Sequence, residues 1–460
     1  MVCYEKRAPA HRIVLSGGAN MLRKRLIYNT ALLTGSSLLM SCIGMAFQVW
    51  LVGRIGSAGI GLYQLVLSVT NLCATFAISG IRFAATRLVS EEIGGDNSTG
   101  IRAAMGRCIS YGALFGLAAA AVLWLLAEPL GFLWIGDART VLSLRISALG
   151  MPCISLCAAI SGYFTACGRV WKPTLVHLIE QLIGIALVAF CLEQVPAADI
   201  ISLVMMFLAY RFDRRRHYGL LSRGTKLTER MLKIALPLAV SAYARSALTT
   251  LQHLLVPRGL KSAGYSADGA LSGYGVIQGM VLPIVFFPSC IMAALAELIV
   301  PELTEAQVRK DAPGIRRTTG ELFRLSLIFS LAVGVFMFVF ADMLGQAVYK
   351  SAEAGRYIRI LAPLIPIMYT DMTVDGCLKG LGQQVWSMAI NILDALLGLL
   401  LVWQLLPRYA LGAYIFIIYF TELVNFVLSV NRLKKLLGGR LTARRSSPET
   451  TAQKSAVPPA

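Results

Sequence analysis

The chain has 460 residues, of which 57% are hydrophobic and 15% are charged, and its mean hydropathy is +0.68. Charged residues make up about 25% of an ordinary globular chain, so this composition excludes a soluble globular protein. A formal net charge of +19 would suggest a nucleic-acid partner in a soluble chain. Here the basic residues lie mainly between apolar segments, so membrane topology accounts for them and we expect no nucleic-acid partner.

Apolar segments recur along almost the whole chain, and a helix needs about 20 apolar residues to cross the hydrocarbon core. We predict an all-α polytopic membrane protein with about 12 transmembrane helices, at 26–52, 58–80, 108–127, 142–166, 173–192, 197–210, 231–256, 275–300, 322–344, 358–380, 385–406 and 411–430. The sixth segment is short. We keep it as a short or distorted crossing, because without it the basic run from Arg211 would lie outside the cell. Both termini are then predicted to be cytoplasmic, in a multi-pass protein of the cell membrane.

Residues of the fourth and fifth segments recur at a constant separation of 214 in the tenth and eleventh. Arg145, Pro152 and Gly162 match Arg359, Pro366 and Gly376, and Glu180 matches Asp394. A separation of six helices keeps each matched pair in the same orientation, which predicts two parallel six-helix bundles related by an axis along the membrane normal. The predicted division is a cytoplasmic N-terminal segment at 1–25, bundles at 26–210 and 231–437, a basic cytoplasmic linker at 211–230 and a disordered cytoplasmic tail at 438–460.

Several kinds of chemistry have no support in the sequence. No connection between the segments exceeds about 30 residues and no G-x-x-x-x-G-K-[ST] phosphate loop occurs, so we expect neither an ATP-driven pump nor an enzyme. The ten cysteines contain no C-x-x-C pair, and His177 and His253 lack a second ligand nearby in the sequence. We therefore expect no disulfide framework, no metal site and no cofactor apart from a coupling ion.

An ionisable side chain inside a bilayer is costly and is a functional candidate by default. Arg245 lies midway along the seventh segment, where its guanidinium could bind a phosphate through paired N–H donors, or form a structural ion pair. Arg82 and Arg87 follow the second segment and could bind a lipid headgroup at an entrance. The preference of arginine for the cytoplasmic side explains them equally well.

Four acidic residues are candidates for binding a coupling ion, Na⁺ or H⁺. Glu180 and Asp394 occupy equivalent repeat positions, and the alternative for each is a hydrogen bond between helices. Asp371 and Asp375 are spaced i, i+4 on one helix face and could form a cation-binding pair, or border water near Gly376.

Several short motifs together carry a family resemblance from about residue 26 to residue 437. They are Gly53-Arg54-Ile55-Gly56, Gly80-Ile81-Arg82-Phe83-Ala84, Gly162-Tyr163-Phe164, Ile234-Ala235-Leu236-Pro237 and Leu298-Ile299-Val300-Pro301-Glu302. With the repeat, they resemble the stage V sporulation protein B branch of the multidrug/oligosaccharidyl-lipid/polysaccharide exporter superfamily. Two features depart from that branch. Its members often carry two more C-terminal helices, and relatives often place arginines in the first helix where this chain has Ser41 and Gln48.

The resemblance implies a flippase for a polyprenyl-pyrophosphate-linked glycan, working as a monomer among membrane lipids, in spore cortex or envelope polysaccharide synthesis. We expect helices 1, 2, 7 and 8 to line its cavity, with alternating access between the two halves. Two alternatives stay open. One is a cation-coupled multidrug antiporter of the same superfamily, and the other is a non-transporting scaffold for envelope assembly.

Overall fold

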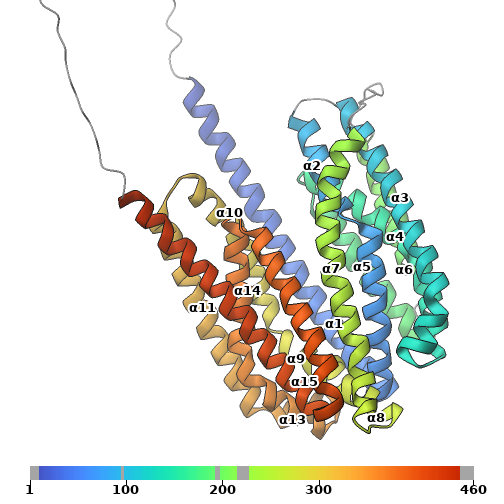
Figure 1. The fold of residues 1–460 in the computed structure, drawn as a ribbon. Helices are drawn as coiled ribbons and strands as arrows, with labels where there is room; N and C mark the ends of the chain where they lie inside the picture. The colour runs from blue at the N-terminus through green and yellow to red at the C-terminus, as the bar shows by residue number, and fades with distance from the viewer. Residues whose placement is uncertain (1–9, 95–97, 192–196, 215–226, 446–460) are drawn as a thin grey trace, which may run out of the picture.

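The computed structural model describes residues 10–94, 98–191, 197–214 and 227–445, and this part of the chain forms helices and no strand (Figure 1). The first half contains α1 (Ala10–Ile78), α2 (Ile81–Gly94), α3 (Ser98–Pro129), η1 (Leu130–Ile135), α4 (Arg139–Ala166), α5 (Trp171–Cys191) and α6 (Ala197–Arg214). Here η1 is a short π-helix that continues α3.

The second half begins with α7 (Leu227–Ser262), α8 (Ala267–Gly275), the π-helix η2 (Val276–Val281), α9 (Leu282–Phe286) and α10 (Ser289–Val308). It continues with α11 (Ala312–Val339), α12 (Ala341–Tyr349), α13 (Ala352–Leu361), the short η3 (Ala362–Leu364), α14 (Ile365–Gly380) and α15 (Gln384–Arg445).

The all-α polytopic membrane architecture predicted from the sequence is confirmed. Seven helical stretches in the described ranges are long and apolar enough to cross a membrane: Gly35–Ile93, Gly100–Ile135, Arg139–Ala166, Thr228–Ser262, Ala267–Phe286, Ala312–Val339 and Gln384–Gly438. The first and last of these are each far longer than one crossing requires. The count of twelve crossings stays a prediction.

The longest helices change direction at single residues. In α1 the backbone leaves helical geometry at Gly56, whose φ of 70° is readily reached only without a Cβ. In α15 the corresponding break is at Ala410. We call residues 10–55 and 57–78 the first and second limbs of α1, and residues 384–409 and 411–445 the first and second limbs of α15. Figure 1 shows that the paired limbs run in opposite directions.

Several predicted boundaries shift at the ends of helices. The first helix begins at Ala10, within the predicted N-terminal segment, and α15 continues to Arg445, beyond the predicted start of the tail. The sixth segment forms α6, whose 18 residues span about 27 Å at 1.5 Å per residue. That length is close to the hydrocarbon thickness of about 30 Å, so a short crossing is physically reasonable. Most of the predicted basic linker lies outside the described residues.

Buried apolar clusters show how the two halves are joined. At the end remote from the termini one cluster combines residues of both halves, including Leu65, Leu144, Leu260, Leu271 and Leu406. At the terminus-side end the described residues form separate clusters. One lies around α2, α3 and α4, and the other around α10, α11 and α14. The halves are therefore packed together at one end and stand apart at the other, as Figure 1 shows.

Helices α1 and α7 also pack across the predicted division between bundles. Leu51 and Val52 of the first limb of α1 join a cluster made mainly by the second half. Met231 and Ala235 at the start of α7 join the cluster of the first half. The predicted division into two bundles at 211–230 therefore stays a prediction. In the packing, each half also contacts one helix that the prediction assigns to the other half.

Candidate functional site

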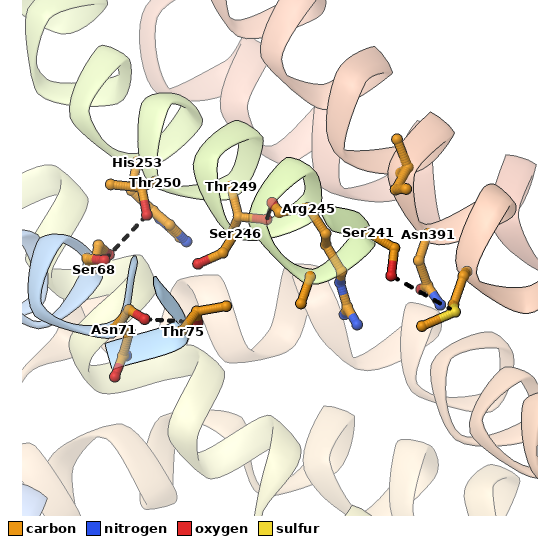
Figure 2. A pocket seen from close by; sticks show the side chains of 13 residues that line it. Ser68, Asn71, Thr75, Ser241, Arg245, Ser246, Thr249, Thr250, His253 and Asn391 are labelled. Atoms are coloured by element: carbon orange, nitrogen blue, oxygen red, sulfur yellow. Dashed lines mark hydrogen bonds between the residues drawn. The ribbon is translucent and has the colours of Figure 1, made fainter. Parts of the chain in front are cut away.

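The site is built around a cavity of about 450 Å³ between three helical segments (Figure 2). The second limb of α1, α7 and the first limb of α15 supply its walls. Its lining residues are Ser68, Asn71, Thr75, Ser241, Ala242, Arg245, Ser246, Thr249, Thr250, His253, Met388, Asn391 and Ile392. The prediction that helices 1, 2, 7 and 8 line the cavity is thus wrong in part. Helices 2 and 7 do so, and the eleventh crossing takes the place of helices 1 and 8, which pack together at the remote end.

Register between α7 and the second limb of α1 is fixed by hydrogen bonds that border the cavity. The Thr250 hydroxyl donates to the backbone carbonyl of Ser68 (3.1 Å), and the Tyr243 hydroxyl donates to Ser79 Oγ (2.5 Å). At the remote end the Tyr274 hydroxyl contacts Nδ1 of His253 at 3.1 Å. The first two bonds hold α7 against the second limb of α1, and the third joins α7 to α8.

Arg245 lies in the wall of this cavity, and Figure 2 shows its guanidinium extending away from the α7 ribbon, between Ser246 and Ser241. Within the described residues no hydrogen bond or ion pair is formed by its guanidinium. Asp394, one turn beyond Asn391 on the same limb of α15, is near enough to interact with Arg245 electrostatically. The structural ion pair considered for Arg245 is therefore not formed as a direct contact, and its N–H donors stay available to a ligand.

Three carboxyl groups come near one another in the second half. Asp371 on α14 accepts a hydrogen bond from Asn425 (3.1 Å), and it interacts electrostatically with Glu422 and Asp394. One oxygen each of Asp371 and Asp394 is buried without a hydrogen-bond partner among the described residues. Asn425 is a partner that sequence reasoning missed, and Glu422 lies one turn before it. Both lie on the apolar second limb of α15.

Asp375 differs from Asp371, although the two share a helix face. Its carboxylate lies 2.6 Å from Lys379 Nζ and accepts a hydrogen bond from Ser387. These two contacts occupy Asp375, so it is not placed as the open half of a cation-binding pair with Asp371. In the part of the chain that the structure describes, no group of three or more His, Cys, Asp or Glu residues is arranged to hold a metal ion.

Glu180 lines a separate, smaller cavity of about 140 Å³ in the first half, together with Arg82, His177 and Asp199. His177 Nδ1 lies 3.0 Å from the Glu180 carboxylate. The carboxyl group of Asp199 comes within hydrogen-bonding reach of Glu180. Sequence reasoning missed Asp199, although an acidic residue in the first turn of the sixth apolar segment was a signal that could have identified it.

The three predicted substrate-binding arginines are not brought together. Arg245 lines the larger cavity, whereas Arg82 lines the cavity of Glu180. Arg87 is exposed and pairs with Glu91 one turn further along α2, at 3.1 Å. Topology therefore remains a sufficient explanation for Arg87.

Comparison with known proteins shows which family this chain belongs to. The MatE family profile matches residues 33–190 and 262–404, well over half of the chain. The chain belongs to the MatE family. It is accordingly a multi-pass membrane transporter or flippase of the multidrug/oligosaccharidyl-lipid/polysaccharide exporter superfamily, as its sequence motifs predicted.

Relatives within this superfamily carry two kinds of names. The chain is 22% identical over 413 residues to "Stage V sporulation protein B" of Bacillus subtilis (strain 168), covering 85% of this chain and 80% of that protein. Among solved structures it resembles "Lipid II flippase MurJ, inward closed conformation", with a TM-score of 0.68, 13% identity and coverage of 87% and 86%. It also resembles an inward-facing multidrug resistance MATE family transporter, with a TM-score of 0.66, 15% identity and coverage of 89% and 96%. At these identities the two structures establish the fold alone.

Proposed function

We propose that this MatE-family protein is a flippase that moves a lipid-linked oligosaccharide, or a peptidoglycan-type precursor, across the cytoplasmic membrane by alternating access. Its setting would be spore cortex or envelope polysaccharide synthesis, and both termini would be cytoplasmic. The observation that carries the proposal is Arg245, whose guanidinium has no hydrogen-bond or ion-pair partner among the described residues and lies in a hydroxyl-lined cavity between the two halves. A guanidinium is the side chain best suited to bind phosphate, because its planar N–H donors match two phosphate oxygens at once.

Two further features support a lipid-linked substrate with a polar headgroup. Most of the cavity lining carries hydroxyl or amide groups, which can hydrogen-bond to sugars. The separate clusters at the terminus-side end fit a headgroup that enters from that end, while the joined cluster closes the other end. The polyprenyl chain would stay in the surrounding lipid, where burial of its apolar surface is favourable.

A coupling ion would drive the cycle. We infer that H⁺ or Na⁺ binds the carboxyl groups of Asp371 and Asp394 in the second half, with Glu180 and Asp199 as the second candidate site. Because Asp394 interacts electrostatically with Arg245, a phosphate bound at Arg245 would change the field at Asp394. Substrate binding and ion binding would then be linked, and the linkage would be reciprocal.

The multidrug antiporter is the second candidate, and the buried carboxyl groups are the observation that favours it. Against it stands the charge of Arg245, since a positive charge in a cavity of low dielectric repels cationic compounds. Efflux of cationic dyes from everted vesicles would decide this point. Ion-coupled efflux that survives Arg245→Ala and is abolished by Asp371→Asn would favour the antiporter over the flippase.

The direct test is translocation of a fluorescent lipid-linked glycan in proteoliposomes, read by chemical quenching of the outer leaflet. Arg245→Ala should reduce translocation about tenfold or more, because a charge-assisted contact is lost. Arg309→Ala is the matched control, since Arg309 lies on the terminus-side surface directly after α10 and, among the described residues, forms an ion pair with Glu305 of that helix alone, at 2.5 Å. Equal translocation by Arg245→Ala and the wild type would remove Arg245 from the mechanism and refute the proposal.

A further inference from the structure

Four hydroxyl groups in the wall of the Arg245 cavity donate their hydrogens to backbone carbonyls. Thr75 donates to the carbonyl of the residue four positions earlier at 2.8 Å, and Thr249 does the same at 3.0 Å. Thr250 donates across to the neighbouring helix at 3.1 Å, and Ser241 donates to the Leu238 carbonyl at 2.9 Å and also contacts Met388 Sδ at 3.9 Å. Figure 2 shows the bonds of Thr75, Thr249 and Thr250.

This bonding pattern fixes what the wall can offer a ligand. A hydroxyl has one hydrogen and two lone pairs, so a hydroxyl that already donates can only accept from a further partner. Asn391 adds another acceptor, because its Nδ2 donates to the Ser387 carbonyl at 2.9 Å and its Oδ1 has no bond of its own among the described residues. The wall is therefore rich in acceptors.

The charged donors of the same wall all belong to Arg245. Arg245 supplies five N–H groups, whereas Asn71, Ser246, Ser68, His253 and the second N–H of Asn391 can each add a donor elsewhere in the wall; Asn71 and Ser246 lie across the cavity from one another in Figure 2. A phosphate consists of acceptors alone, so it fits at Arg245 but would face lone pairs against the four hydroxyls. A ligand that satisfies the whole wall must carry hydroxyl or amide donors beside its anionic group.

We propose that this cavity selects glycosylated over unglycosylated polyprenyl phosphates, and that Thr75, Thr249, Thr250 and Ser241 determine the selection by accepting hydrogen bonds from sugar hydroxyls. The inference rests on the proposed function and deepens it. It assigns the anionic group to Arg245 and the recognition of the sugar to side chains without charge. The selection has a clear physical basis, because a site built to hydrogen-bond a ligand group rejects the analogue that lacks it.

The experiment measures the affinity of the full-length protein in lipid nanodiscs for two probes. One is a short-chain polyprenyl phosphate, and the other is the same lipid with one hexose on its phosphate. The wild type should bind the glycosylated probe about tenfold more tightly, since each hydrogen bond gained contributes a factor of about two to ten. Thr249→Val keeps the shape of the side chain and should reduce this ratio about threefold or more, with unchanged affinity for the unglycosylated probe.

Two control variants separate recognition from structure. Thr174→Val removes a hydroxyl with the same bond to the carbonyl four residues earlier (2.8 Å), at the start of α5 and outside the cavity lining. It should leave both affinities unchanged. Arg245→Gln should weaken both probes together.

Each outcome has one meaning. An unchanged ratio in Thr249→Val, or an equal loss of ratio in Thr174→Val, would overturn the inference. Equal binding of both probes by the wild type, with weaker binding of both in Arg245→Gln, would overturn the selection but leave the proposed flippase standing. Binding of neither probe by the wild type would refute the proposed function itself.

Discussion

The guanidinium of Arg145 on α4 lies 2.6 Å from the carboxylate of Glu128 on α3, and this ion pair joins two helices near the end remote from the termini. Arg359 on α13 and Asp342 on α12 form the same contact at 2.5 Å. The partners in each pair are 17 residues apart, and the second pair follows the first by 214 residues. The internal repeat therefore extends from matched residues to a matched contact.

Charge reversal tests the Arg145 pair. Both side chains are partly exposed, at 35% and 61%, so solvent screening keeps the contribution of the pair small. Arg145→Glu should lower the midpoint of thermal unfolding in detergent by about 1 to 3 °C, because it places two negative charges together. Adding Glu128→Arg should restore most of the loss. A double variant no more stable than Arg145→Glu would show that the two side chains do not interact.

The seam between α1 and α8 closes the remote end and makes a second prediction. A Cβ at Gly61 would lie 2.2 Å from the Leu271 carbonyl oxygen, and a Cβ at Gly275 would lie 2.1 Å from the Ser57 carbonyl oxygen. Beside these contacts the hydroxyls of Ser57 and Ser272 are 2.7 Å apart. Only glycine allows this approach, so the two helices meet closely at the remote end, and the proposed alternating access requires this seam to separate.

A reversible crosslink across this seam provides the measurement. In the double variant Ser57→Cys, Ser272→Cys, mild oxidation should stop translocation of the fluorescent lipid-linked glycan, and a reducing agent should restore it. Each single variant under the same oxidant controls for the native cysteines of the chain, of which Cys42 is exposed. Full translocation by the crosslinked double variant would show that the seam does not open during the cycle.

Asp213 at the terminus-side end of α6 predicts a dependence of stability on pH. It is 4% exposed and accepts hydrogen bonds from Arg169, from Lys172 (3.0 Å) and from Tyr163 (3.1 Å). Burial alone would raise the pKa of this carboxyl, but the contacts with Lys172 and Arg169 outweigh it and hold the pKa below its ordinary value. A lowered folded-state pKa adds stability above the unfolded-state pKa of about 3.9, and this contribution disappears as the pH falls through the folded-state value.

The measurement is the thermal midpoint of the wild type and of Asp213→Asn between neutral pH and about pH 3. The wild type should be more stable at neutral pH, and the difference should shrink below about pH 4 as Asp213 takes up a proton. Comparing the two variants at each pH cancels the titration of all other carboxyl groups. A difference that stays constant over the whole range would contradict the assigned role of Asp213.

Asp371 and Asp375 should differ in their effect on ion coupling. Asp371 has a buried oxygen without a partner, whereas Asp375 is held by Lys379 and Ser387. Asp371→Asn should therefore abolish the dependence of translocation on a H⁺ or Na⁺ gradient, with Asp375→Asn as the matched control that keeps it. Gradient dependence that is lost in Asp375→Asn and kept in Asp371→Asn would reverse the assignment.

The sequence by itself determined the features that depend on composition and local pattern. Apolar length set the membrane-spanning helical class, and the 214-residue repeat around Arg145 and Arg359 set two related halves, because both properties reside in the order of residues along the chain. The cost of placing a charged side chain inside the bilayer also identified Arg245 as a functional candidate from the sequence alone.

Only the tertiary structure decided which side chains meet. It placed the first limb of α15 in the cavity wall where helices 1 and 8 were expected, brought Asp199 to Glu180, and joined Asp375 to Lys379 rather than to an open site beside Asp371. A helical pattern identifies which residues share a face but not which helix will cover that face. That choice depends on packing between segments far apart in the chain. A single added atom, such as a Cβ at Gly61 facing α8, is enough to prevent a close contact of this kind.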